Sequence, residues 1–328
     1  MLKIIKSSKI YADIAAFFAL LLVAMMISVN KKYQIAVLDG ISLWAGAILP
    51  AMFPYLIIIT LLSALKSTAK IPRLLSPVTT RMFNVNGNVG FALFLSVLCG
   101  YPVGAQCVSD LKNRDLIGDA ESIRAAALCS SSSPVFLIAS VGNITFGNSL
   151  FGLLLFATHL ISLLIVGFVF AFYKRKESPK SLTYTAPPKN DNLFYDSVYS
   201  AVISVLVVGG IISIFYLLTE MLADIGVIGL IADIIQPIIH DNTESLGIVN
   251  GFFECTKGLK ILASGGISRF TLPVAAAICG FGGISVIMQS LAYLKKAQIK
   301  TAPFLISKTL AAVINFIIGL TLSAIFLA

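Results

Sequence analysis

Long apolar segments, separated by short polar ones, dominate the sequence. The predominantly apolar runs without a central break cover residues 10–29, which is apolar except for Asp13, and 41–65, 149–173, 196–222 and 301–327. Each run is close to the ~20 residues that a helix needs to cross the hydrocarbon of a bilayer. They therefore predict transmembrane helices.

The first apolar run resembles a signal peptide in its position, since Lys3, Lys6 and Lys9 precede it. It is long for a signal peptide, however, and no small-x-small cleavage site stands before Asn30. These features favour a first span that is retained.

Four other apolar segments are interrupted near their middle. Segment 87–111 contains the turn residues GYPVG, and segment 246–264 contains the polar string NGFFECTKG. Their halves are too short to cross a bilayer, so both segments predict re-entrant helical hairpins. Segments 123–140 and 270–294 are broken by SSSSP and CGFGG. These two predict broken transmembrane helices.

The same order of elements occurs twice: span, hairpin, broken span, plain span. Gly104 corresponds to Gly258, and Cys129 to Cys279. Each four-element unit crosses the membrane three times, so the second unit starts from the opposite side. The sequence thus predicts an all-α polytopic membrane protein with inverted repeats, each with a re-entrant helical hairpin and a broken transmembrane helix. The expected parts are an N-terminal helix and outer loop (1–40), repeat 1 (41–173), a cytoplasmic linker (174–192) and repeat 2 (193–328).

Composition supports a membrane protein. Hydrophobic residues make up 58% of the 328 positions, charged residues only 12%, and the mean hydropathy is +0.94. Soluble domains carry about 25% charged residues. This excludes a soluble globular enzyme, a disordered chain and a nucleic-acid binder, and it makes the lipid bilayer the first partner. The two His and five scattered Cys form no catalytic or metal-binding pattern, so we expect neither an enzyme nor a resident cofactor.

Positive charges predict the orientation, because Lys and Arg collect in short cytoplasmic loops. With the N-terminus inside and the C-terminus outside, 18 of the 24 Lys and Arg residues fall on the cytoplasmic side. These are Lys3, Lys6, Lys9, Lys66, Lys70, Arg73, Arg81, Lys112, Arg114, Arg124, Lys174, Arg175, Lys176, Lys180, Lys189, Lys295, Lys296 and Lys300. We expect connector 112–122 to be charged and solvated, and the acidic outer connector 223–244 to be helical at the surface.

The four breaks are the candidate site. Each supplies the amino end of a half-helix, where free N–H groups and the helix dipole favour an anion. The alternative is that the Gly and Ser residues only allow close helix packing. The side chains that the breaks offer for binding a solute are Tyr101, Ser130, Ser131, Ser132, Ser133, Asn250, Glu254 and Lys257. His159, alone in an apolar span, is expected to be a hydrogen-bonded packing residue.

Glu254 and Lys257 lie in the second hairpin, where ionisable side chains are costly and usually functional. Their spacing of three residues allows an ion pair on a helical turn. The pair could only stabilise the hairpin, or it could contact a charged or hydroxyl-bearing solute. Glu254 could also carry a coupling proton, whereas carbonyl groups at the breaks could hold sodium. The sequence does not separate these alternatives.

The strings CGYPVGA, CSSSSPVFLI, NGFFECTKG and CGFGGISV together resemble the YlbJ (SpoVV) family of sporulation integral membrane proteins over nearly the whole chain. More distantly, NGFFE and AAICGFGGIS are similar to nucleoside-recognition (gate) domains and to concentrative nucleoside transporters. The resemblance implies a substrate held between two hairpin tips and two unwound helices. It adds Pro102, Val103, Gly104, Thr256, Gly280, Gly282, Gly283 and Ser285 to the expected binding residues.

The resemblance also implies a function. YlbJ-like proteins are implicated in moving dipicolinate, a pyridine dicarboxylate, across a membrane of the developing spore. We therefore expect a bacterial membrane carrier of a small carboxylate-bearing anion that works by elevator-like alternating access. GYPVGA departs from the acidic, amide-bearing tip of the nucleoside carriers, which argues against nucleosides. A nucleoside or nucleobase carrier and a non-transporting structural protein of spore or envelope assembly stay open, as does a homo-oligomer.

Overall fold

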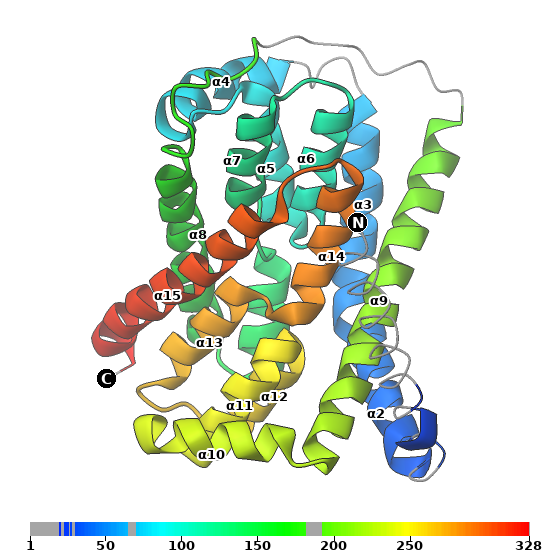
Figure 1. Ribbon diagram of the computed structural model, residues 1–328, viewed down its shortest axis with the longest axis vertical. Helices are drawn as coiled ribbons and strands as arrows, with labels where there is room; N and C mark the ends of the chain where they lie inside the picture. The colour runs from blue at the N-terminus through cyan, green and yellow to red at the C-terminus, as the bar shows by residue number, and fades with distance from the viewer. Residues whose placement is uncertain are drawn as a thin grey trace, which may run out of the picture.

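The computed structural model describes residues 20, 23–25, 27, 30–64, 70–181 and 192–327, and all regular structure in these ranges is helical (Figure 1). Most of the expected first span, Lys66 and Lys189 lie outside the described residues. The elements, of which η1 and η3 are π-helical, are α2 (Asn30–Leu43), η1 (Trp44–Ile48), α3 (Leu49–Ala64), α4 (Lys70–Phe83), α5 (Gly87–Cys99), α6 (Val103–Asn113), α7 (Asp119–Leu128), η3 (Val135–Thr145), α8 (Ser149–Phe170), α9 (Leu193–Asp224), α10 (Val227–Ile239), α11 (Asn242–Phe253), α12 (Cys255–Ser264), α13 (Thr271–Phe281), α14 (Gly283–Lys296) and α15 (Thr301–Phe326).

Several helices are long and apolar enough to cross a membrane. Within the described residues these are α8, α9, the α13–α14 pair and α15, which makes 4 candidate spans. The number rises to 6 if the bent pairs 31–58 and 70–99 each count as one span. The prediction of an all-α polytopic membrane protein is confirmed.

The interrupted segments form the predicted hairpins and broken helices. α5 and α6 form one hairpin and α11 and α12 the other, while α7–η3 and α13–α14 are the broken helices. Figure 1 shows the first hairpin in the upper half of the molecule and the second in the lower half. The two hairpins therefore enter from opposite ends, as inverted repeats require.

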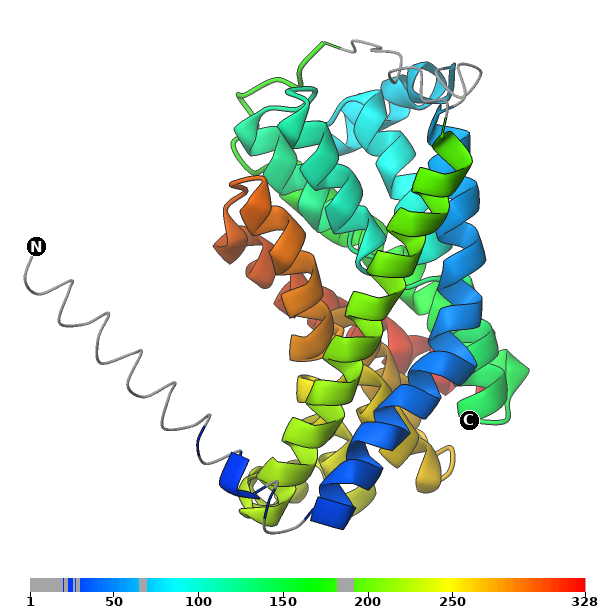
Figure 2. The same ribbon diagram turned by 90° about the vertical axis from the view of Figure 1, so that its right-hand side faces the viewer.

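The helix before the first hairpin begins earlier than expected. It starts at Asn30 and continues through η1 and α3 to Ala64, whereas the apolar run predicted a span from Ile41 and a loop before it. The prediction is wrong because the polar first turns are anchored to the end of α9: Lys32 pairs with the Asp224 carboxylate, and the Tyr33 hydroxyl donates to it over 2.9 Å. Figure 2 shows α2–α3 and α9 running alongside each other.

A short amphipathic helix precedes each hairpin, α4 at the upper end and α10 at the lower end (Figure 1). Each exposes apolar residues at every fourth position: Leu74, Val78 and Met82 on α4, and Leu230, Ile234 and Ile238 on α10. Such an exposed stripe on a surface helix fits the boundary between headgroups and hydrocarbon. The expectation of a surface helix between 223 and 244 is confirmed by α10.

Connector 112–122 is not fully solvated, contrary to expectation. Glu121 and Ser122 are buried in the first turns of α7, where Glu121 accepts from the backbone N–H groups of Asn86 (2.8 Å) and Lys180 (3.0 Å). Arg124 is buried too, and its guanidinium donates to the carbonyl of Tyr173 over 3.0 Å at the end of α8. These charges are buried because they satisfy backbone groups at helix ends.

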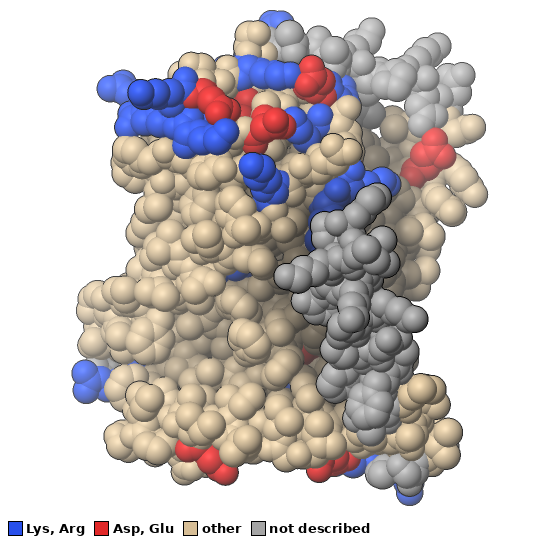
Figure 3. All heavy atoms as spheres, in the orientation of Figure 1, with Lys and Arg blue, Asp and Glu red and all other residues tan. Residues whose placement is uncertain are grey.

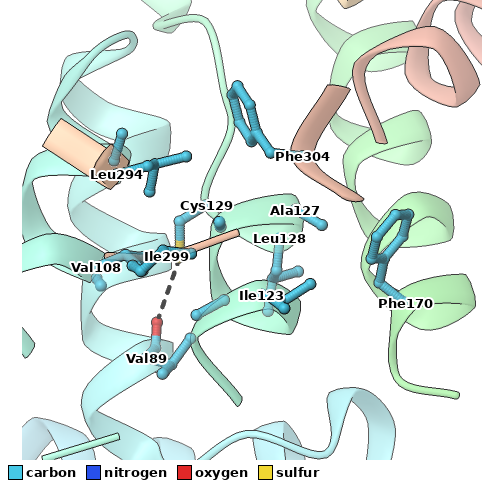
Figure 4. Close-up of a cluster of buried hydrophobic side chains, with 14 of the residues drawn as sticks. Val89, Val108, Ile123, Ala127, Leu128, Cys129, Phe170, Leu294, Ile299 and Phe304 are labelled. Carbon is cyan, nitrogen blue, oxygen red and sulfur yellow. Dashed lines mark hydrogen bonds between the residues drawn. The ribbon is translucent and has the colours of Figure 1, made fainter. Parts of the chain in front are cut away.

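Buried apolar residues join the first hairpin to the rest of the molecule. Figure 4 shows the cluster around Val89, Leu128 and Phe304, in which the Cys129 thiol lies 3.8 Å from the Val89 carbonyl oxygen. Cys129 and its repeat counterpart Cys279 are both fully buried. Both act as small packing residues.

Glycine allows the first hairpin to approach the broken helix closely. A side-chain carbon on Gly104 would collide with the carbonyl oxygen of Cys129 and would lie 2.6 Å from the Ser96 hydroxyl oxygen. Gly258, its counterpart, performs a different task, since it brings α12 against Gly251 of α11. Of these two counterparts, Gly104 joins a hairpin to a broken helix, whereas Gly258 joins the two helices of its own hairpin.

The two ends of the molecule differ in charge. Figure 3 shows most of the visible Lys and Arg at the upper end, among several Asp and Glu, a middle zone with few charges, and a few charges of both signs at the lower end. The upper end carries α4 with Lys70, Arg73 and Arg81, and the lower end carries α10, which contains Asp233 but neither Lys nor Arg (Figure 1). The arrangement fits a bilayer around the middle zone and a cytoplasmic upper end.

The orientation can be tested with a membrane-impermeant maleimide on intact cells. We expect Asp241→Cys to react from outside and Lys176→Cys to react only after permeabilisation, because positive loops stay in the cytoplasm. The wild-type chain, with its largely buried cysteines, is the background control. The opposite labelling pattern would reverse the assigned orientation.

The close approach at Gly104 can be tested by thermal unfolding in detergent. We expect Gly104→Ala to lower stability by about 1–3 kcal/mol, because the added methyl group overpacks a rigid contact. Gly210→Ala is the matched control, since nothing lies within 4 Å of its side-chain position. Equal unfolding temperatures for the two variants would contradict the structure.

Candidate functional site

The first broken helix, α7–η3, is interrupted at residues 129–133, which we call the first break. Its backbone N–H and C=O groups lack helical partners, and side chains from three other parts of the chain form hydrogen bonds with them. The Ser96 hydroxyl of α5 donates to the Cys129 carbonyl over 2.6 Å, and the Tyr101 hydroxyl donates to the Ser130 carbonyl over 3.2 Å. The Ser132 N–H donates to Nε2 of His159 on α8 over 2.9 Å. Polar backbone can lie inside a membrane protein only when it has such partners.

Tyr101 forms the tip of the first hairpin, directly after Gly100, whose φ of +77° suits glycine. The tip lies against the first break, since a side chain on Gly100 would come within 2.8 Å of the Ser133 nitrogen. The Tyr101 hydroxyl also accepts a hydrogen bond of 2.6 Å from Nζ of Lys308. Tyr101 thus joins the hairpin, the break and α15.

Lys308 is the unexpected residue of the site. It lies in the first third of α15, where it is 1% exposed, and its Nζ lies 4.2 Å from the centre of the Tyr101 ring. Among the ion pairs of the described residues, none includes Lys308. A buried intramembrane ammonium without a carboxylate partner is costly, and such a residue usually serves binding or transport.

Glu254 forms the tip of the second hairpin. Its backbone is extended between α11 and α12, and its carboxylate caps α12 by accepting from the Lys257 N–H over 2.7 Å. The hydroxyl of Thr256 donates to the same oxygen, and the Ser285 hydroxyl lies 3.5 Å from the other. A buried carboxylate is stabilised by these donors and by the positive end of the helix dipole.

The expected ion pair between Glu254 and Lys257 does not form between their side chains. Nζ of Lys257 lies instead 2.8 Å from a Glu220 carboxylate oxygen and 2.8 Å from the Thr219 hydroxyl, both on α9. It lines a separate cavity of about 360 Å³ near the lower end, together with Lys32. The cap geometry explains this outcome, because it turns the Glu254 carboxylate toward the backbone of its own helix.

A central cavity of about 70 Å³ lies where the hairpin tips and broken helices meet. Its polar lining comes from the breaks, and its opposite wall is apolar. The polar residues and the glycines at the breaks are Gly100, Tyr101, Ser132, Ser133, Glu254, Thr256, Gly282 and Gln289. The wall consists of Ile48, Met52, Val208 and Ile212, from η1, α3 and α9.

The cavity contains six of the predicted residues: Tyr101, Ser132, Ser133, Glu254, Thr256 and Gly282. Four of the others do not line the cavity but lie in the same hairpins and broken helices. The Ser131 hydroxyl donates to the Ser132 carbonyl and the Asn250 amide to the Leu246 carbonyl, while Ser285 donates to Glu254. Gly283 lies against the second tip.

The last five predicted residues lie away from the central cavity. Pro102, Val103 and Gly104 are buried behind the first tip, and Gly280 is packed against Asn315. Ser130 faces a second, smaller cavity. None of the five lines the central cavity.

Two residues next to the candidate site are missed or undervalued by the sequence analysis. Lys308 was overlooked, although one lysine inside the otherwise apolar run 301–327 is itself a signal of function. His159 was expected to be a hydrogen-bonded packing residue, and it does make a hydrogen bond, but the bond supports the first break. Its position next to the site depends on contacts between distant segments.

No protein-family model matches the chain. The sporulation integral membrane protein YlbJ of Bacillus subtilis (strain 168) is 28% identical to it over 331 aligned residues, which cover 93% of this chain and 81% of that protein. The similarity thus extends over nearly the whole chain, including both hairpins and both broken helices. It supports the predicted resemblance to the YlbJ-like sporulation integral membrane proteins.

Proposed function

We propose that the protein is a secondary transporter of a small carboxylate-bearing anion, with dipicolinate as the leading candidate substrate. One observation carries the proposal. Four helix breaks meet around one central cavity, and a buried lysine without a carboxylate partner, Lys308, reaches the Tyr101 tip of that cavity. An anion would supply the missing counter-charge.

The chemistry of the cavity suits a planar dicarboxylate. α14 begins at the cavity without a side-chain cap, so its free N–H groups can bind carboxylate oxygens. Phe136 and the wall residues Met52 and Ile212 offer apolar contacts to a ring. The Glu254 carboxylate already accepts hydrogen bonds from neighbouring donors, so it does not need a cationic substrate.

The packing supports an elevator-like movement. α2 and α9 form a tightly packed unit, since a side chain on Gly209 would come within 2.6 Å of the Trp44 ring and one on Gly40 within 2.8 Å of the Ser213 Cα. This unit gives the cavity a wall of apolar side chains, which hold no hydrogen bond across the cavity. The hairpins and broken helices would slide along it with a bound solute, a movement that breaks the bonds of Lys257 to Thr219 and Glu220 on α9.

The relative's name supports a role in a spore-related membrane. A nucleoside carrier of the same architecture is the second candidate, favoured by Gln289 and Thr256 in the cavity, since an amide and a hydroxyl suit a base and a ribose. A non-transporting structural protein of spore or envelope assembly would show no uptake of either solute. The next experiment separates all three.

Uptake into proteoliposomes that contain the purified full chain tests the substrate. We expect accumulation of labelled dipicolinate that excess unlabelled dipicolinate abolishes and that uridine and adenosine leave unchanged, because the site is built for carboxylates. Competition by nucleosides alone would favour the nucleoside carrier. Absence of uptake and of binding for both classes would contradict a transporter.

Substitution of Lys308 tests the site. We expect Lys308→Met to weaken dipicolinate binding by about 10- to 100-fold, because hydrogen bonds to a charged group contribute about 1.5–3 kcal/mol. Lys308→Arg keeps the charge and should retain more affinity. Lys295→Met, at an exposed position near the end of α14, is the control. Affinity equal to wild type in Lys308→Met, measured by calorimetry, would remove Lys308 from the site.

A further inference from the structure

A second, smaller cavity lies next to Lys308, between the end of α7, α8 and α15. Its polar lining is formed by Ser130, His159, Ser162, Ser307, Lys308 and Asn315. The volume is about 10 Å³, close to the ~10–15 Å³ that one water molecule needs. The cavity is therefore a site for a single small polar molecule.

Three buried polar atoms in the cavity lack a hydrogen-bond partner: the Ser130 hydroxyl oxygen, Nδ1 of His159 and Oδ1 of Asn315. They make up half of the 6 such atoms in the described part of the chain. Buried polar atoms nearly always have a partner, which can be an ordered water. Their gathering in one cavity points to a bound molecule.

The hydrogen bonds that these residues do make define what the molecule must offer. Nε2 of His159 accepts from the Ser132 N–H, so the proton of the neutral ring is on Nδ1, which is a donor. The Asn315 amide donates to the Ala311 carbonyl over 2.8 Å, which leaves Oδ1 as an acceptor. Ser130 can do either. Water, which both donates and accepts, fits this set.

Sodium fits the cavity poorly. The ammonium group of Lys308 would repel it, and the N–H of His159 offers a proton where the ion would need a lone pair. The Asn315 carbonyl and the hydroxyls of Ser130, Ser162 and Ser307 offer fewer oxygen ligands than a hard cation takes, and none of them is a carboxylate. The chemistry of the lining therefore favours binding of a proton over binding of a metal ion in this cavity.

We propose that this cavity holds a water molecule which, together with Lys308 and His159, forms the proton-binding site of the carrier, so that one proton moves with the substrate anion. The inference rests on the proposed transport function. A proton adds to the lone pair of the Lys308 amine, forming an N–H bond, and the ammonium group then faces the substrate carboxylate. On release that N–H bond breaks and the proton returns to water.

The surroundings of Lys308 support coupling to an anion. The titratable groups that face it are Tyr101 at the hairpin tip, His159 on α8, and the thiols of Cys255 and Cys279 on α12 and α13. No carboxylate is among them. A lone ammonium in hydrocarbon is costly, and a substrate carboxylate offsets that cost. Proton and anion therefore stabilise each other when both are bound.

His159 connects proton binding to the shape of the site. A second proton on the ring would occupy Nε2 and break the bond to the Ser132 N–H. A change of protonation in the small cavity thus alters a hydrogen bond to the backbone of the first break, which lines the central cavity at Ser132. The small cavity and the substrate site share a segment of three residues, from Ser130 to Ser132.

Proton movement can be measured with a trapped pH-sensitive dye in proteoliposomes. We expect dipicolinate added outside to acidify the lumen in the wild-type protein and an inward proton gradient to accelerate uptake. Dipicolinate uptake without acidification and without a response to the gradient would overturn the inference while leaving the transport function intact. If the wild-type protein neither binds nor transports dipicolinate, the proposed function fails instead.

Two variants refine the test. His159→Gln keeps an acceptor for the Ser132 N–H but cannot take up a proton, and Asn315→Leu removes the acceptor in the cavity. We expect the gradient response to fall by about tenfold or more in both variants. Asn315→Leu should still bind dipicolinate within about twofold of wild type, since Asn315 does not line the central cavity. Thr309→Val, exposed on α15, is the control. A gradient response equal to wild type in both variants would overturn the inference, and the wild-type measurement decides alone if the variants do not fold.

Discussion

The structure depends on the need of every backbone N–H and C=O group for a partner in hydrocarbon. A continuous helix meets this need by itself, whereas the five residues from 129 to 133 leave the helix and cannot. Ser96, Tyr101 and His159 supply the missing partners from three separate elements. The first break can therefore form only after the hairpin and α8 have packed around it, which makes the site a product of the whole fold.

The two broken helices, α7–η3 and α13–α14, are stabilised in different ways. In the first half, side chains form hydrogen bonds with the backbone of the broken helix. In the second half, the backbone of the broken helix packs directly against the backbone of the hairpin, since a side chain on Gly283 would lie 3.0 Å from the Cys255 nitrogen and 3.0 Å from the Gly251 carbonyl oxygen. Glu254 is consequently free to cap its own helix. This difference places the positive charge of the site on the side of the first tip and the negative charge at the second.

The breaks, the hairpins and the helical class could be predicted from sequence because they follow from local composition: Gly, Pro and Ser inside apolar runs. The side-chain pairings could not. A spacing of three residues suggested an ion pair between Glu254 and Lys257, but the spacing does not specify the cap that separates them. Likewise Tyr101 and Lys308 are 207 positions apart, and only the packing of the helices brings them together.

The amphipathic helices α4 and α10 set a limit on how the molecule sits in its bilayer. Their exposed apolar stripes lie at opposite ends and fix the separation of the two lipid interfaces that the protein tolerates. Lipids with much longer or shorter acyl chains would force a mismatch at one of these helices. The stability of this architecture therefore depends on membrane thickness, and the protein would be more stable in a membrane whose thickness matches the separation of α4 and α10 than in one that does not.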